Sequence, residues 1–313
     1  MMSKPVDDIR REIDSLDDQV HDLLMKRAEL VVRIGEEKRK NDIQVVQPCR
    51  EMMMLRRLLA RHEGLLPKEA IVRIWRELVG AVSLLQKGLK VVVTVPDDNS
   101  GLVYWDMAKD YFSSVLPMTK AANPLLAVSM VREGEATFAV VPWPADGQDK
   151  PWWPFLMDSS GDVPMRVVAR LPLGDRSRES ANPEFRALAV ARLKFEPSGD
   201  DRSLLALALD HSVSRTRIVD QARELKLEPR SLYSRVVGEG AGNMHLLEVD
   251  GYVAADDERL KTFLSKLGAE ESGKCLCLGG YPVPPVYDDK VGKNAISDSA
   301  SSTEVKKSSS AAG

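Results

Sequence analysis

Apolar residues recur at intervals of three and four along the first 40 residues, which predicts one long amphipathic helix. We expect this helix to run from about Pro5 to Lys40, with its apolar positions in one narrow seam of the coiled-coil type. Two shorter helices should follow, because Pro48 and Pro67 each precede a periodic stretch. The two short helices are too short to cover the whole seam, so we expect a partner chain to cover the remainder. The seam consists of Val6, Ile9, Ile13, Leu16, Val20, Leu23, Leu30 and Ile34.

The chain after residue 88 alternates short apolar runs with amphipathic stretches, the pattern of a mixed α/β region. From Ser203 the predicted order is strand, helix, strand, strand, helix, strand, which is typical of a ferredoxin-like sandwich. From Asp288 the chain is rich in Ser, Ala, Lys and Asp, so we expect a disordered tail. The prediction is a multidomain chain: an all-α three-helix domain (1–88), an α/β lobe (89–187), an α+β βαββαβ domain (188–287) and the tail (288–313).

Composition supports this division and excludes several classes of protein. Residues 1–88 hold 17 Lys and Arg against 15 Asp and Glu, with Trp75 as their one aromatic residue, whereas the remaining residues hold 27 against 32. The net charge of -3 argues against a generally basic nucleic-acid binder. Apolar runs fall far short of the ~20 residues of a spanning helix, and no secretory signal is visible. The three cysteines provide no disulfide framework. We therefore expect a soluble, cytoplasmic protein with no membrane or nucleic-acid partner.

Two cations interrupt the apolar seam of the first helix. Arg27 falls in the series 6, 13, 20, 27, 34, and Lys38 lies three turns further along the same face. Cations on a buried seam are costly unless an anion meets them. A salt bridge to Glu51, or solvent at the helix end, would explain them without a ligand. Arg50, Glu51 and Gln86 add polar groups at expected core positions, so the set also fits a polar pocket for a small dianion.

Residues 6–86 resemble the all-helical chorismate mutases, the type fused to prephenate dehydratase or dehydrogenase in many bacteria. The matching segments are IRREIDSLDDQVHDLLMKRAELVVRIGEEK (9–38), QPCRE (47–51) and IVRIWRELVGAVSLLQ (71–86). The resemblance implies rearrangement of chorismate to prephenate, in which Lys38 and Gln86 bind the ether oxygen and Glu51 binds the substrate hydroxyl. This pericyclic reaction needs no nucleophile, so no cofactor or metal is expected. The implied catalytic residues are Lys38, Gln86, Arg27 and Glu51, and the implied substrate-binding residues are Arg10, Arg27, Lys38, Gln47, Arg50, Glu51 and Gln86.

The position of Arg10 predicts active sites shared between two chains. Arg10 precedes Arg27 by 17 residues, which is about 25 Å along a straight helix. Both side chains cannot reach one small substrate from the same chain. We therefore expect a homodimer in which Arg10 serves the partner's site.

The C-terminal region weakly resembles one lobe of prephenate dehydratase, with its best match at 125–147, followed over 203–284 by a resemblance to the ACT regulatory domain. The ACT resemblance includes Tyr233-Ser234-Arg235, and it implies an amino-acid effector. Acids occupy the expected anion loop (95–101), and too few residues separate Leu171 from Phe185 for a second lobe. The family's Thr-Arg-Phe motif is replaced by Phe185-Arg186-Ala187. We expect a regulatory or structural region without dehydratase activity.

Because every implied mutase residue precedes Lys87, we expect residues 1–88 to form a soluble, active dimer by themselves. The alternative reading of the whole chain is a non-catalytic helical dimerisation module joined to an ACT-like small-molecule sensor.

Overall fold

The structure is a computed structural model that describes most of the chain between residues 4 and 287. For residues 4, 85–87 and 101 only the backbone is described. The predicted tail, 288–313, lies outside the described residues. In the part that is described, no helix is both long and apolar enough to cross a membrane. The described residues are 4–96, 101–148, 150–158, 163–174, 186–236 and 242–287.

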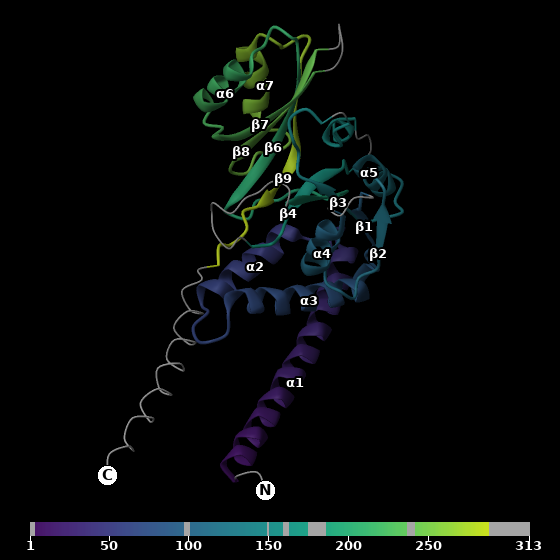
Figure 1. The fold of residues 1–313 in the computed structure, drawn as a ribbon, viewed down its shortest axis with the longest axis vertical. Helices are drawn as coiled ribbons and strands as arrows, with labels where there is room; N and C mark the ends of the chain where they lie inside the picture. The colour runs from purple at the N-terminus through teal and green to yellow at the C-terminus, as the bar shows by residue number, and fades with distance from the viewer. Residues whose placement is uncertain are drawn as a thin grey trace, which may run out of the picture.

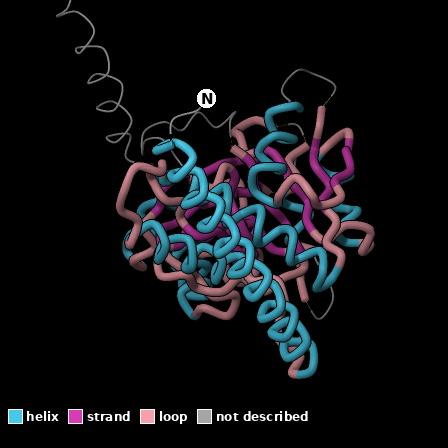
Figure 2. The backbone as a smooth tube through the Cα atoms, turned by 90° about the horizontal axis from the view of Figure 1, so that it is seen from below, coloured by secondary structure: helices cyan, strands magenta, loops and turns pink. Residues whose placement is uncertain are grey.

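The N-terminal part is helical, and its first helix extends away from the rest of the molecule (Figures 1 and 2). This helix is continuous over its whole length, and its seam residues Ile9, Ile13 and Leu16 are exposed. Pro48 occupies the first turn of the second helix, where its missing N–H leaves no hydrogen bond unmade. Gly88 ends the third helix in the left-handed conformation that favours glycine. The three helices are α1 (Lys4–Lys40), α2 (Pro48–Ala60) and α3 (Lys68–Lys87).

The rest of the described chain is a mixed α/β region in which nine strands form one sheet. The sheet order is β2-β1-β3-β5-β4-β9-β6-β8-β7. Sequence patterns missed two strands, β2 and β5, and the 3-10 helix η1. The elements before Asp201 are β1 (Val91–Thr94), α4 (Gly101–Phe112), β2 (Met118–Ala121), α5 (Pro124–Arg132), β3 (Phe138–Pro142), η1 (Trp153–Leu156), β4 (Arg166–Leu171) and β5 (Ala187–Ala191).

The predicted strand–helix–strand–strand–helix–strand order is confirmed from Asp201 onward. Its four strands lie in the order β9-β6-β8-β7 with antiparallel neighbours, and α6 and α7 cover one face (Figure 1). This unit joins the rest of the sheet where β4 pairs with β9 at Val167 and Gly279. A Cβ on Gly279 would lie 2.2 Å from the Val167 carbonyl oxygen, so the junction requires glycine. The elements are β6 (Asp201–Leu209), α6 (Arg215–Glu224), β7 (Pro229–Val236), β8 (Asn243–Asp250), α7 (Glu258–Leu267) and β9 (Lys274–Pro282).

The helical part and the α/β region share one hydrophobic core. Met52 and Leu55 of α2 and Val72 of α3 are buried in the same cluster as Phe112 of α4. Helix α3 approaches α4 so closely that a Cβ on Gly80 would lie 2.3 Å from the Phe112 carbonyl oxygen. Removing residues 89–313 would expose these apolar faces to water. The expectation that residues 1–88 form a soluble domain by themselves is therefore revised.

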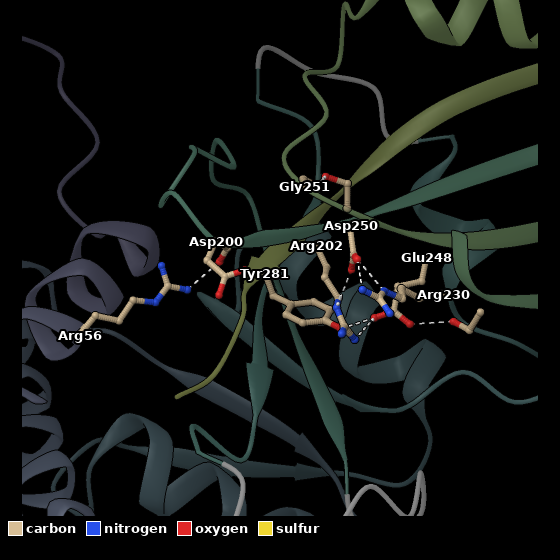
Figure 3. A network of polar contacts seen from close by, with 10 residues as sticks. Arg56, Asp200, Arg202, Arg230, Glu248, Asp250, Gly251 and Tyr281 are labelled. Carbon is tan, nitrogen blue, oxygen red and sulfur yellow. Dashed lines mark hydrogen bonds and ion pairs between the residues drawn. The ribbon is translucent and has the colours of Figure 1, made fainter. Parts of the chain in front are cut away.

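Arg56 anchors α2 to the segment before β6 and to the residue after β9. Its guanidinium donates to the carbonyl oxygens of Ser198, Asp200 and Val283 and to the Ser198 hydroxyl. Beside this contact, a polar network joins β6, β7, β8 and β9 (Figure 3). Its central members are Arg202, Arg230, Glu248, Asp250 and Tyr281.

Candidate active site

A cavity of about 690 Å³ lies between α1, the loop that follows it, α2 and α3. Arg27 and Lys38 both line this cavity although they are 11 residues apart, because three helical turns separate them. Gln47, Arg50 and Glu51 enter the cavity from the start of α2, and Val82 and Ser83 enter from α3. The helix start also explains the role of Gln47. It occupies the N-cap position without capping the helix, so its amide is available to the cavity.

Lys38 is held in place by two hydrogen bonds. Its ammonium donates to the Gln47 side-chain oxygen (2.6 Å) and to the Val45 carbonyl oxygen (3.1 Å). Burial lowers the pKa of Lys38 below its usual value, and Arg50 lowers it further, while Glu196 and Glu51 oppose the shift. The lowered pKa of Lys38 therefore comes mainly from the removal of its ammonium from water.

Glu51 is fixed by a cation from α3. Arg76 donates to the Glu51 carboxylate at 2.7 Å. The Arg76 side chain is only 5% exposed and the Glu51 side chain 20%. The same guanidinium donates to the Tyr111 carbonyl oxygen and stacks over the Tyr111 ring. Arg76 thus neutralises the acid of the cavity and links it to α4.

The structure brings five of the seven residues predicted for the site to this cavity: Arg27, Lys38, Gln47, Arg50 and Glu51. Arg10 lies outside it on the exposed part of α1, beside Asp7. Because α1 is unbroken, the separation of about 25 Å between Arg10 and Arg27 holds. The backbone of Gln86 continues α3, but its side chain lies outside the described residues.

Three further charged residues of the site were missed by sequence reasoning. Arg57 lines the cavity two turns after Arg50, a spacing that the helical period would have revealed. Arg76 lies one turn after the buried Val72, on the same face of α3. A cation at a position where the helical period predicts an apolar residue could have indicated its role. Glu196 approaches from the α/β region, where its carboxylate accepts from the Gln47 amide at 3.4 Å. No local pattern indicates that contact.

The charges of the cavity define a class of site. Arg27, Lys38, Arg50 and Arg57 line it together with one acid, Glu51, which Arg76 already neutralises. Guanidinium groups bind carboxylates in bidentate fashion, and the remainder of the wall is mainly apolar. The site is therefore a cationic pocket suited to a small molecule with two carboxylates.

Comparison with known families agrees with this class of site. Residues 9–87 match the family model described as chorismate mutase type II. The N-terminal part of the chain is therefore similar to chorismate mutases of type II. All five cavity residues predicted from the sequence lie within the matched segment.

Two curated relatives share part of this chain. The bifunctional chorismate mutase/prephenate dehydratase of Aquifex aeolicus (strain VF5) is 37% identical over 93 residues, which are 28% of this chain and 26% of that protein. The protein of the same description from Neisseria gonorrhoeae (strain ATCC 700825 / FA 1090) is 31% identical over 99 residues, 30% of this chain and 27% of that protein. The chain thus matches about a quarter of the length of these relatives.

Two solved structures are distantly similar to most of the chain. The prephenate dehydratase from Streptococcus mutans covers 63% of this chain and 99% of its own, with a TM-score of 0.42 and 14% identity. The prephenate dehydratase in complex with L-Phe from Arthrobacter aurescens covers 68% of this chain and 97% of its own, with a TM-score of 0.44 and 14% identity.

Proposed function

We propose that this protein is a chorismate mutase, which rearranges chorismate to prephenate in aromatic amino-acid biosynthesis without a cofactor. One observation carries the proposal: the cavity that contains Arg27, Lys38, Gln47, Arg50 and Glu51 lies inside the segment that matches the mutase family. The presence of these residues together in one cavity favours the enzyme over a non-catalytic dimerisation module.

The proposed mechanism rests on positioning and on charge. Chorismate carries two carboxylates, and the cationic wall holds them so that the two ends of the reacting system meet. As the ether bond breaks, negative charge grows on the ether oxygen, where Lys38 and Gln86 donate. Glu51 accepts a hydrogen bond from the substrate hydroxyl, and Arg76 fixes the carboxylate for this task. No proton is transferred, so Glu51 acts as a binding group rather than a base.

The active protein in this proposal is a homodimer. Eight residues of one α1 face are 41–66% exposed, which is unusual for a contiguous apolar surface. Their spacing of three and four residues suits a second helix. A second copy of the chain would cover this face and bring Arg10 to the partner's cavity. The face consists of Val6, Ile9, Ile13, Leu16, Val20, Leu23, Leu30 and Ile34.

The C-terminal region is proposed to be ACT-like in its βαββαβ part, regulatory or structural in role, and without dehydratase activity. A dehydratase cleft needs two lobes. Here β5 returns to the first lobe and inserts between β3 and β4, which leaves no second lobe among the described residues. Phe185, at the altered Thr-Arg-Phe motif, lies outside the described residues.

The proposal is tested by following chorismate in the ultraviolet with the purified full chain. Catalysed loss of chorismate with formation of prephenate is expected, and no phenylpyruvate should appear above the background rate when prephenate is supplied. Absence of chorismate turnover by a folded dimer would favour the non-catalytic dimerisation module, and catalysed phenylpyruvate formation would refute the account of the C-terminal region.

A further inference from the structure

The connection between β5 and β6 is fixed to the helical part of the chain on both sides of Glu196. Before Glu196, the Gln44 side chain exchanges two hydrogen bonds with the Lys194 backbone, at 2.7 and 3.3 Å. After it, Arg56 donates to the Ser198 carbonyl oxygen at 3.0 Å and to the Ser198 hydroxyl at 3.1 Å. The backbone at Glu196 is therefore held against α2 and the loop before it.

The Glu196 side chain reaches the mutase cavity through Gln47. It is half-buried and accepts a hydrogen bond from Gln47 Nε2 at 3.4 Å. Gln47 Oε1 in turn accepts from the Lys38 ammonium at 2.6 Å. Glu196 is not one of the residues that line the cavity, and it lies outside residues 9–87, which match the mutase family. Any role of Glu196 in the site is therefore exerted through Gln47 and through its own charge.

The two partners of Gln47 determine which end of its amide faces the lysine of the cavity. A lysine ammonium only donates, so the amide must present its oxygen to Lys38. A carboxylate only accepts, so Glu196 requires the amide nitrogen. The Gln47 side chain does not cap α2, so the start of the helix does not fix its orientation. Glu196 and Lys38 thus select the same orientation of the amide from its two ends.

Glu196 also contributes to the charge around Lys38. Burial is the main cause that lowers the pKa of Lys38, and Arg50 lowers it further. Glu196 raises this pKa, and Glu51 raises it to a smaller extent. Glu51 is already paired with Arg76 of α3. Glu196 is therefore the acid that most favours the charged form of the lysine. The other charged groups that the described residues contribute to the cavity wall are Arg27 from α1 and Arg50, Glu51 and Arg57 from α2.

We propose that Glu196 is a positioning residue of the mutase site, which orients the Gln47 amide toward Lys38 and keeps the Lys38 ammonium charged. An ammonium has three donors, and the oxygens of Val45 and Gln47 accept two of them. The third is left for the ether oxygen of the substrate, where the proposed mechanism requires a charged donor. This role rests on the proposed mutase function, and it makes the site depend on a residue outside the segment that matches the family.

Two substitutions in the full chain separate the charge of Glu196 from its hydrogen bond. Glu196→Gln retains an oxygen that can accept from Gln47 but removes the charge, so the pKa of Lys38 should fall further. The loss of activity with rising pH should then begin about half a pH unit or more below its wild-type position. Glu196→Ala also removes the acceptor, and it should lower kcat about tenfold even at a pH where Lys38 is charged. Asp200→Asn is the matched control, because it removes the same charge from an exposed side chain of the same connection and should change neither quantity.

Exchanging the two side chains provides a rescue. In the double variant Gln47→Glu with Glu196→Gln, the acid lies directly beside Lys38, and the amide at position 196 donates to it. The pH at which activity is lost should return to the wild-type value or rise above it. A residue that only docks the two parts of the chain would not give this reversal. The role of Glu196 is overturned by an unchanged pH profile in Glu196→Gln together with unchanged kcat in Glu196→Ala, by an equal shift in Asp200→Asn, or by no reversal in the double variant.

A titration that does not depend on activity separates this inference from the proposed function. NMR of the full chain with isotope-labelled lysine follows the protonation of Lys38, and Lys38→Arg assigns its signal. Glu196→Gln should lower the pKa of Lys38, and Asp200→Asn should not. An inactive wild-type protein would refute the proposed function, and the titration would still decide whether Glu196 acts on Lys38. An identical titration of Lys38 in the wild-type protein and in Glu196→Gln would overturn that action.

Discussion

Mixing two inactive variants should restore activity if each active site draws residues from two chains. The two substitutions are Arg10→Ala and Lys38→Ala. Arg10 lies about 25 Å along an unbroken helix from Arg27, so it serves the partner's cavity in the proposed dimer. In a heterodimer, one site then collects both substitutions and the other site collects neither.

The size of the recovery follows from the symmetry of the dimer. When equal amounts of the two variants exchange subunits at random, about half of the dimers are mixed, and each mixed dimer has one intact site of two. The mixture should therefore reach about one quarter of wild-type activity per chain. Each variant alone should have far less, since each lacks a cation that the proposed mechanism places against the substrate.

The assay follows chorismate loss in the ultraviolet before and after exchange, with native mass spectrometry of tagged chains to count the mixed dimers. Crosslinking each homodimer beforehand should abolish the recovery. Arg11→Ala provides the matched control, because Arg11 is exposed one position away and pairs with Asp8; this variant should be active without mixing. If mixed dimers form and activity does not return, Arg10 acts on its own chain or has no role, and the shared-site proposal fails.

Three further predictions address the site and the fold. Lys38→Ala should raise the activation barrier by about 3 kcal/mol and so lower kcat, with an unchanged circular dichroism spectrum. Because the pKa of Lys38 is lowered, the activity of the wild-type protein should already fall as the pH rises toward 10.5. Turnover by the variant at the wild-type rate would show that Lys38 is not part of the site. Arg56→Ala should reduce the free energy of unfolding by about 2–3 kcal/mol in thermal melts, whereas Arg57→Ala should not, and equal stabilities would contradict the anchoring role of Arg56. Burial lowers the pKa of His245 from 6.5 to about 4. The unfolded chain therefore binds the proton first, and stability should fall between about pH 6.5 and pH 4 by at most about 3 kcal/mol. His245→Gln should flatten this part of the stability profile, and an identical profile in the variant would exclude His245 as its origin.

The helical period accounts for what the sequence determined about the site. A spacing of 11 residues places Arg27 and Lys38 on one face of any straight helix, so their position on a common face needed no tertiary information. Pro48 likewise determined where α2 begins, which places Gln47 and Glu51 beside each other in space. The apolar runs and amphipathic stretches determined the βαββαβ order, because each reflects the period of a single strand or helix. These are local relations, which the backbone geometry of a single element imposes.

Contacts between distant segments were decided by tertiary structure. Glu51 and Arg76 pair across 25 residues, and Gln47 meets Glu196 across 149. The insertion of β5 between β3 and β4 depends on pairing partners that its own short apolar run cannot specify. The shared core of α2, α3 and α4 likewise joins segments that composition had separated. The period of a helix or strand determines which side chains share a face of that element. Which apolar face or buried charge meets which partner depends on the surfaces that pack together, and that is a property of the folded chain alone.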